Sequence, residues 1–297
     1  MNRENWLGLL PLAFIFVSSA VLAAWAFAAG PFEHTISPIL AELGPFEIRY
    51  YGLVYMLGFI LVYFVLRHAA KKGDMALDSD GIEKFVLLLI VGVVIGARLF
   101  EVLIYNPSWY FSHPVEIVRI WNGGLSFHGG LAGVLFVTWL FSRKAGRPAF
   151  AELCDLLTIP ALLMLVFGRL ANFINGELYG GVSTIPWAVS FPGADGYRHP
   201  VQIYEAVCNA VSFGILFFVR SFPAARSARG VLSACFLIFY GGFRFFVEFS
   251  KDYNEYGYDT LQFGSIHVAH ILCLLMAACG VYILIRVYRA ARASRVR

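Results

Sequence analysis

The sequence predicts an all-α, polytopic transmembrane helical bundle of about eight spans, and the composition is the first observation that predicts this class. Apolar residues make up 59% of the 297 positions and charged residues only 14%, whereas a soluble domain usually has about 25% charged residues. The mean hydropathy of +0.71 agrees with this difference. A soluble core of this length cannot enclose so much apolar surface, so we expect the chain to be embedded in a bilayer.

The second observation is the length of the apolar runs, because a helix needs about 20 apolar residues to cross the hydrocarbon core. Such long, continuous runs also disfavour a barrel, whose strands alternate apolar and polar residues. The expected spans are residues 6–29, 50–66, 83–105, 125–142, 153–174, 201–219, 231–249 and 266–285. They predict an N-terminal anchor (1–30), an integral membrane domain (31–289) and a basic cytoplasmic tail (290–297). The first run ends like a signal-peptide cleavage site, but its length favours an uncleaved anchor.

The third observation is the placement of the basic residues. With the N-terminus in the cytoplasm, 16 of the 23 Lys and Arg fall in cytoplasmic segments, whereas the exterior segment 251–259 is acidic. This is the distribution that the positive-inside rule requires, so both termini are expected in the cytoplasm. The basic residues form no stripe that would suit nucleic acid. The five cysteines lie in apolar stretches without zinc or redox spacing, and we expect them to be packing groups.

Several charged residues lie within the expected spans, where they usually mark a functional site. Three sets have helical spacing, which places each set on one face of its helix. The sets are Arg98, Glu101 and Tyr105; Gln202, Glu205 and Asn209; and Tyr240, Arg244 and Glu248. We expect them to face a common polar cavity. The alternative is that the Arg98–Glu101 and Arg244–Glu248 pairs only stabilise their helices.

Two motifs have residues suited to chemistry. Residues 168–180 read GRLANFINGELYG, and the planar fork of Arg169 and the amide of Asn172 suit a phosphate. The alternative is an Arg169 side chain that extends to the lipid headgroups. Residues 123–130 read GGLSFHGG, in which His128 can gain or lose a proton near neutral pH. His128 is therefore either a catalytic group or a packed polar residue.

These motifs, together with residues 49–52, 198–205 and 240–249, resemble those of the bacterial prolipoprotein diacylglyceryl transferases, in the same order and over about residues 31–285. The resemblance implies transfer of the diacylglyceryl group of phosphatidylglycerol to the lipobox cysteine of a prolipoprotein signal peptide, with release of glycerol 1-phosphate. It implies no cofactor or metal. It also implies a place among the lipids of the bacterial inner membrane, with the active site toward the outer leaflet and seven spans besides the extra N-terminal one.

The resemblance also implies roles for particular residues. We expect Arg169 and Arg244 to bind the phosphate, and His128 to assist the acceptor thiol, whose ordinary pKa is about 8.5. The expected catalytic residues are His128, Arg169, Asn172, Glu177, Arg244 and Tyr51. The residues expected to bind phosphatidylglycerol are Arg169, Arg244, Arg98, Tyr240, Glu205 and Glu248.

Three positions depart from the family pattern. Gly181 stands where the family commonly has a basic residue, Lys251 replaces an Arg, and His267 and His270 stand where a Gly-Gln pattern is expected. These changes leave open a divergent paralogue with another lipid donor or acceptor. A lipid transporter or flippase would need repeat-related broken helices, and an intramembrane serine protease would rest on Ser265 and His267 alone.

Overall fold

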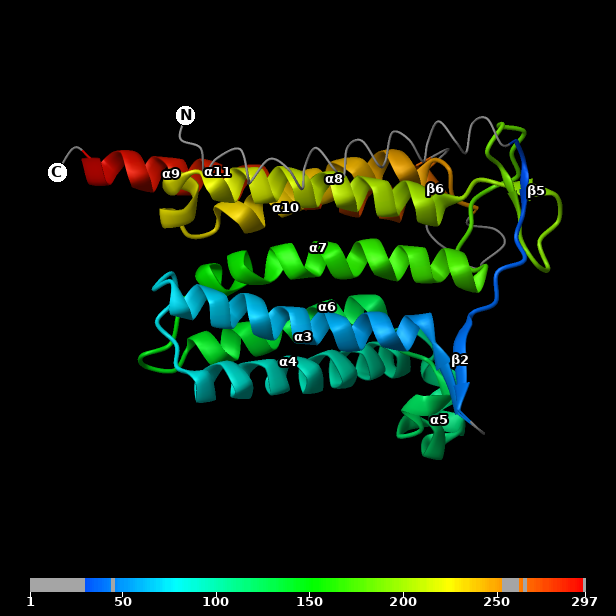
Figure 1. Ribbon diagram of the computed structural model, residues 1–297, viewed down its shortest axis with the longest axis horizontal. Coiled ribbons are helices and arrows are strands. Elements are labelled where there is room, and N and C mark those ends of the chain that lie inside the picture. Colours follow the sequence, from blue (N-terminus) through cyan, green and yellow to red (C-terminus); the bar gives the residue numbers. More distant parts are fainter. Residues whose placement is uncertain (1–29, 44–45, 253–261, 264–265, 296–297) are drawn as a thin grey trace. The chain divides into compact units, whose positions relative to one another are not determined.

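The computed structural model describes residues 30–43, 46–252, 262–263 and 266–295 (Figure 1). The chain divides into two compact units. The flanking unit comprises the residues up to Gly58 together with Thr158–Arg297, and the central unit comprises Phe59–Leu157. Helices α3 (Tyr50–Lys71) and α7 (Phe150–Asn175) belong partly to each. Long helices joined by loops and very short strands confirm the predicted all-α class.

Six described helices are long and apolar enough to cross a membrane, which confirms a multi-pass membrane protein. They are Gly52–Lys71, Ser79–Tyr105, Phe150–Asn175, Val201–Ser221, Val231–Glu248 and Ala269–Ala293. Helix α6 (Phe127–Ser142) has 16 residues and extends only about 24 Å, so the span predicted at 125–142 is a shorter apolar helix. The anchor predicted at 1–30 lies outside the described residues except for Gly30. The count of eight spans is therefore not confirmed.

In the central unit, α4 (Ser79–Phe100) packs closely against α6. Asp78 caps α4 by accepting a hydrogen bond from the backbone N–H of Gly81 at 2.9 Å. The two helices approach through glycines, because a Cβ at Gly96 would meet the carbonyl oxygen of Gly129. The core beside this crossing consists of Val62, Leu66, Ala69, Met75, Ile82, Phe85, Val86, Leu89, Phe141, Leu153, Leu156 and Leu157.

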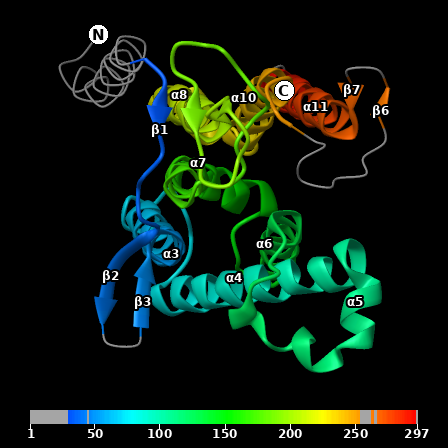
Figure 2. The same ribbon diagram turned by 90° about the vertical axis from the view of Figure 1, so that its right-hand side faces the viewer.

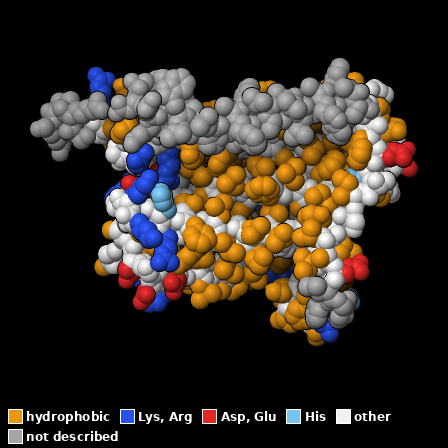
Figure 3. All heavy atoms as spheres, in the orientation of Figure 1, with side chains coloured by type: hydrophobic (Ala, Val, Ile, Leu, Met, Phe, Trp, Pro, Cys, Tyr) orange, Lys and Arg blue, Asp and Glu red, His pale blue; other side chains and the backbone are white. Residues whose placement is uncertain are grey.

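The outer surface of the central unit is apolar along the helices and basic at one end. Along α4, Leu87, Val91, Ile95 and Leu99 repeat every four residues and are 43–61% exposed. Figure 3 shows apolar side chains over the middle of this face and Lys and Arg gathered at one end. The exposed basic residues where α3 ends and α4 begins are Arg67, Lys71, Lys72 and Lys84. Apolar side chains facing outward suit contact with lipid.

The rest of the central unit connects α4 to α6. The segment Glu101–Tyr105 continues α4 as a π-helix, labelled η1. Three short helices follow: α5 (Pro107–Ser112), η2 (Pro114–Ile117) and η3 (Ile120–Asn122). The predicted polar face of Arg98, Glu101 and Tyr105 assumed α-helical spacing, and a π-helix changes that spacing by widening each turn.

In the flanking unit, α10 (Val231–Glu248) packs between α8 (Val201–Ser221) and α11 (Val268–Arg295), as Figure 2 shows. A Cβ at Gly241 would meet the carbonyl oxygen of Cys273, so this glycine lets α10 and α11 approach closely. The short helix α9 (Pro223–Ser227) joins α8 to α10. Residues 290–295, predicted as a tail, continue α11.

Short strands lie near the C-terminal end of α7 and the beginning of α8. β1 (Phe32–Glu33) pairs in parallel with β4 (Val189–Ser190), and β4 pairs antiparallel with β5 (Tyr197–Arg198). The antiparallel pairs β2 (Ile39–Leu43) with β3 (Phe46–Arg49), and β6 (Gln262–Phe263) with β7 (Ile266–His267), are separate. The three-stranded sheet joins the predicted loop 175–200 to the segment that precedes the first described span.

Candidate functional site

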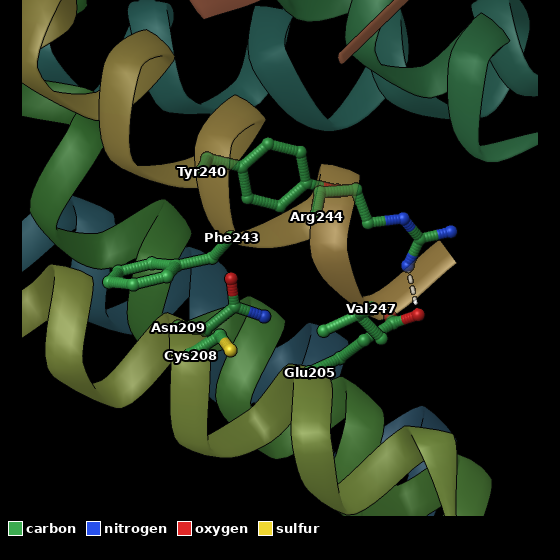
Figure 4. A pocket seen from close by; sticks show the side chains of 7 residues that line it. All are labelled: Glu205, Cys208, Asn209, Tyr240, Phe243, Arg244 and Val247. Atoms are coloured by element: carbon green, nitrogen blue, oxygen red, sulfur yellow. Dashed lines mark ion pairs between the residues drawn. The ribbon is translucent and has the colours of Figure 1, made fainter. Parts of the chain in front are cut away.

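A cluster of charged side chains gathers around Glu205, near the beginning of α8. Glu205 is 5% exposed and forms ion pairs with Arg169 of α7 and Arg244 of α10, the latter shown in Figure 4. A third cation, Lys251, places its Nζ 3.2 Å from Oε1 of Glu205. Residues 82 positions apart in the sequence thus contact one carboxylate, and the predicted polar faces of α8 and α10 meet in this unit.

Glu248 joins the same cluster from the last turn of α10. Its carboxylate, 2% exposed, pairs with Nε of Arg244 and lies 3.7 Å from Nζ of Lys251. The Arg244–Glu248 pair that was considered as a helix-stabilising alternative is therefore present, but Arg244 also bridges to another helix. Three cations and two carboxylates joined by these pairs carry a net charge of +1. Guanidinium and ammonium groups held together in this way suit an anionic group such as a phosphate.

The turn after α7 is held by amide groups next to this cluster. The Nδ2 group of Asn172 donates to Oε1 of Glu177 at 2.8 Å, and Nδ2 of Asn175 donates to the same oxygen at 3.1 Å. Arg169 donates to Oδ1 of Asn172 at 3.4 Å. The buried Gln202 of α8 donates to the Glu177 carbonyl at 2.6 Å. Residues 169–177 are therefore joined by hydrogen bonds among their own side chains.

Gly180 explains how Lys251 comes to lie in the cluster. The backbone N–H of Gly180 donates to the His199 carbonyl at 2.8 Å, and that of Gly181 donates to the Ser250 carbonyl at 3.0 Å. A Cβ at Gly180 would meet the Ser250 carbonyl oxygen and Val201, whereas one at Gly181 would meet nothing within 4 Å. Gly180 is thus required for this close approach, and Gly181 lies where a larger side chain would fit.

A small cavity borders the cluster between α8 and α10 (Figure 4). Its volume is about 10 Å³, which is close to the space of one water molecule. Its lining residues are Glu205, Cys208, Asn209, Tyr240, Phe243, Arg244 and Val247. Tyr240 and Arg244, predicted to share a face of the helix, both line it. The cavity is apolar toward Phe243 and charged toward Arg244.

Lys251 lies beyond the end of α10 and is 20% exposed. Burial lowers the pKa of its ammonium group, while the negative charge of Glu205 opposes that shift. The nearby guanidinium of Arg244 lowers the pKa further. Its two carboxylate partners favour the charged form, so we treat Lys251 as a cation of the cluster.

In the central unit, Arg98 has a different environment from the one predicted. Every N–H of its guanidinium points to a protein oxygen, and its only side-chain acceptor among the described residues is Tyr110. Glu101 instead accepts a hydrogen bond from Asn106 at 2.7 Å. The Arg98–Glu101 ion pair, given above as the alternative to a common polar cavity, is therefore absent, because the loop after η1 supplies backbone carbonyls to the arginine.

His128 lies in the first turn of α6, also in the central unit. Its Nδ1 is 2.8 Å from the hydroxyl of Tyr105. The residues around Glu205 belong to the flanking unit, so a shared cavity between His128 and Arg169 stays a prediction. Tyr51 lies in the first turn of α3.

The structure adds polar residues that sequence reasoning did not place in the site. Lys251 was noted only as a departure from the family pattern, and its ion pairs depend on a loop contact that no motif predicts. Arg198, 6% exposed, pairs with Asp252 at 3.0 Å. His34, also 6% exposed, donates from Nε2 to the Phe173 carbonyl at 2.7 Å. A single histidine in a loop gave no signal in the sequence.

His267 and His270, the third departure, lie on either side of the beginning of α11, since His267 ends β7 and His270 is in the first turn of the helix. The ring of His270 is 1% exposed and packs against Phe249 with centroids 4.4 Å apart. Its Nδ1 accepts a hydrogen bond from the backbone N–H of His267 at 3.1 Å. Packing and helix capping account for His270.

Fold and site together define a class: a polytopic helical membrane protein with a buried cationic cluster near one end of its helices. The family model for prolipoprotein diacylglyceryl transferase matches residues 38–286. The chain belongs to this family, which confirms the resemblance found in the motifs and the assignment as a transferase.

Similar proteins agree with this assignment, and all three described here are named phosphatidylglycerol–prolipoprotein diacylglyceryl transferase. The chain is 46% identical to the protein from Geobacter sulfurreducens, over 74% of this chain and 84% of the relative. It is 42% identical to that from Oleidesulfovibrio alaskensis, over 82% and 90%. It is 41% identical to that from Bordetella avium, over 87% and 96%.

Proposed function

We propose that this chain transfers the diacylglyceryl group of phosphatidylglycerol to a prolipoprotein, and that the acceptor is the lipobox cysteine of the signal peptide. In this reaction the sulfur forms a bond to the glyceryl carbon, the bond from that carbon to the phosphate oxygen breaks, and glycerol 1-phosphate leaves with the electron pair. The thiol proton passes to a base. The product is a thioether, formed in the first step of bacterial lipoprotein maturation.

The net charge of the Glu205 cluster supports this proposal most directly. Three cations face two carboxylates, and the phosphodiester of phosphatidylglycerol has one negative charge. Arg169 and Arg244 bind the phosphate and stabilise the charge that grows on it as the carbon–oxygen bond breaks. Glu205 and Glu248 hold the two guanidinium groups in place before the lipid arrives, and Tyr240 borders the lipid headgroup.

The residues of the 172–177 turn order the substrates. Asn172 and Glu177 already share a hydrogen bond, so they present a fixed amide and carboxylate to the glycerol headgroup or the peptide. His128 accepts the thiol proton, because a thiol with an ordinary pKa of about 8.5 is mostly protonated at neutral pH. Tyr51, in the first turn of α3, is the remaining residue to which we assign a catalytic role.

The distribution of charge supports an orientation in the bacterial inner membrane. Basic residues gather where α3 ends and α4 begins, and also in α9 and toward the end of α11. By the positive-inside rule these ends face the cytoplasm. The Glu205 cluster lies near the other end of α7, α8 and α10, so it opens toward the outer leaflet, where the signal peptide emerges.

One experiment tests the reaction. Purified protein in detergent is incubated with phosphatidylglycerol and a lipobox peptide, and the peptide is then analysed by mass spectrometry. We expect a mass increase of one diacylglyceryl group, and none with a peptide whose cysteine is replaced by serine. Peptide cleavage, or an unmodified peptide under conditions in which a related transferase is active, would refute the proposal and favour a protease or a lipid transporter.

A further inference from the structure

We propose that Arg98 is a positioning residue that fixes the beginning of α6 and so orients His128. The inference rests on the proposed function, in which His128 accepts the thiol proton. It gives Arg98 a role other than binding lipid, and it is drawn from contacts within the central unit alone.

Protein oxygens surround Arg98, which lies in the last turn of α4 and is 7% exposed. Its Nε donates to the Ile117 carbonyl at 2.9 Å, and Nη1 donates to the carbonyls of Gly123 at 2.6 Å and Gly124 at 2.7 Å. The remaining acceptors are the carbonyls of Glu116 and Arg119 and the hydroxyl of Tyr110. One guanidinium thus donates hydrogen bonds to carbonyls along the connection between α5 and α6.

Gly123 and Gly124 both have a left-handed backbone conformation. Gly123 and Gly124 have φ values of +89° and +71°, which are strained for residues with a side chain. This conformation turns two successive carbonyls toward Arg98. A Cβ at Gly124 would also meet Tyr110 and the Arg98 guanidinium. The glycines and the arginine therefore depend on each other.

Backbone and capping contacts of Ser126 connect this turn to His128. Two residues after Gly124, the backbone N–H of Ser126 donates to the Ala97 carbonyl at 3.1 Å. The Ser126 hydroxyl caps α6 by accepting from the Gly129 N–H at 3.2 Å. The turn is thus fastened to α4 at adjacent residues, 97 and 98. His128 follows in the first turn of α6, and its ring contacts Tyr105 of η1.

The chemistry explains why arginine occupies this position. A guanidinium has five N–H donors in a planar fork, whereas an ammonium has three on one atom. Lysine cannot reach acceptors on both sides of the fork. Loss of some of these bonds would let the turn shift, and a displacement of about 1 Å at a catalytic group can lower a rate by about 100-fold.

The test is a double-mutant cycle on transfer kinetics. Wild type, Arg98→Lys, His128→Asn and the double variant are purified and assayed with phosphatidylglycerol and the lipobox peptide. We expect Arg98→Lys to lower kcat at least about 10-fold, within the range for a misplaced general base, and to leave the KM for the lipid within about twofold. In the His128→Asn background the same substitution should have no further effect. Lipid binding by Arg98 would instead raise KM, and a purely structural role would lower the activity of both backgrounds equally.

A second pair of variants tests the geometry without changing a charge. Gly124→Ala places a methyl group against Arg98. Gly146 has a similar φ of +73°, but a Cβ at this position would meet nothing within 4 Å, so Gly146→Ala is the matched control. Gly124→Ala should lower kcat by more than its loss of stability, measured as the change in melting temperature, can explain. Gly146→Ala should not. If Arg98→Lys does not fold, Tyr110→Phe takes its place in the cycle.

The outcomes separate this inference from the proposed function. Full activity of Arg98→Lys or of His128→Asn, or equal losses from Arg98→Lys in both backgrounds, overturns the positioning role while transfer itself stands. A wild-type protein that modifies no peptide overturns the proposed function, and the positioning role with it.

Discussion

Arg244→Lys is the most informative substitution in the Glu205 cluster, because it keeps the charge and changes only the geometry. Arg244 contacts Glu205 through Nη1 and Glu248 through Nε. A lysine at this position has one nitrogen in place of these two, so it lacks the planar fork that contacts the two carboxylates through separate atoms. One of the two carboxylates then loses a cationic partner, although both still lie near Lys251, and it repels the incoming phosphate more strongly.

The size of the effect follows from the contact that is lost. A hydrogen bond to a charged group contributes about 1.5–3 kcal/mol, and the Arg244 side chain is only 17% exposed, so water replaces it poorly. Since about 1.4 kcal/mol corresponds to a factor of ten, we expect kcat/KM for phosphatidylglycerol to fall about 10- to 100-fold.

The assay is the initial rate of peptide modification, measured by mass spectrometry over a series of lipid concentrations. Arg226→Lys is the matched control, because Arg226 is an exposed residue of the same unit in the short helix α9. The control should retain the wild-type rate, and both variants should elute as folded protein. An Arg244→Lys variant with wild-type kcat/KM would show that the bidentate arginine is not needed, and the phosphate-binding role would have to be abandoned.

Three further predictions concern the residues around this cluster. Gly180→Ala should lower the melting temperature and abolish transfer, because its methyl group meets the Ser250 carbonyl. Gly181→Ala should behave as wild type in both measurements. Equal effects of the two substitutions would refute the close approach of Gly180 to Ser250. Lys251→Ala should lower kcat/KM by at least about 10-fold, in line with the loss of one charged contact. Lys251→Arg should retain most of the activity. A Lys251→Ala variant with wild-type kcat/KM would show that Lys251 does not take part in binding the phosphate. Burial lowers the pKa of His199 below its usual 6.5, so the folded protein binds fewer protons than the unfolded chain and should lose stability as the pH falls below 6.5. The melting temperature of His199→Asn, followed over the same pH range, should depend less on pH, and parallel curves would contradict this assignment.

Several elements could be predicted from the sequence because they depend on spacing along one helix. Gln202, Glu205 and Asn209 are each at most 5% exposed on α8, as their spacing of three and four residues predicted. The motif around Arg169 was also predictable, since its amides lie within one turn of each other. In contrast, the span predicted at 125–142 forms a helix of only 16 residues, because the Ser126 side chain caps its first turn and the helix begins at Phe127.

The partner of a buried charge could not be predicted, because it is decided by contacts between segments distant in the sequence. Arg98 and Glu101 have ideal spacing for an ion pair, yet five backbone carbonyls from residues 116–124 surround the arginine. Carbonyls are present at every residue, so the sequence has no signal for which of them will converge. Lys251 is similar, because it reaches Glu205 only through the backbone contact of Gly180 and Gly181 with Ser250.

The sequence by itself determined the membrane class, most of the spanning helices and the family, because hydrophobic length and motif order are properties of the linear chain. Only the tertiary structure decided that Glu205 is the common partner of Arg169, Arg244 and Lys251, and that Arg98 is enclosed by backbone carbonyls. The physical reason is that a charge removed from water must find its counter-charge or dipoles in space, and folding brings those groups together from distant parts of the chain.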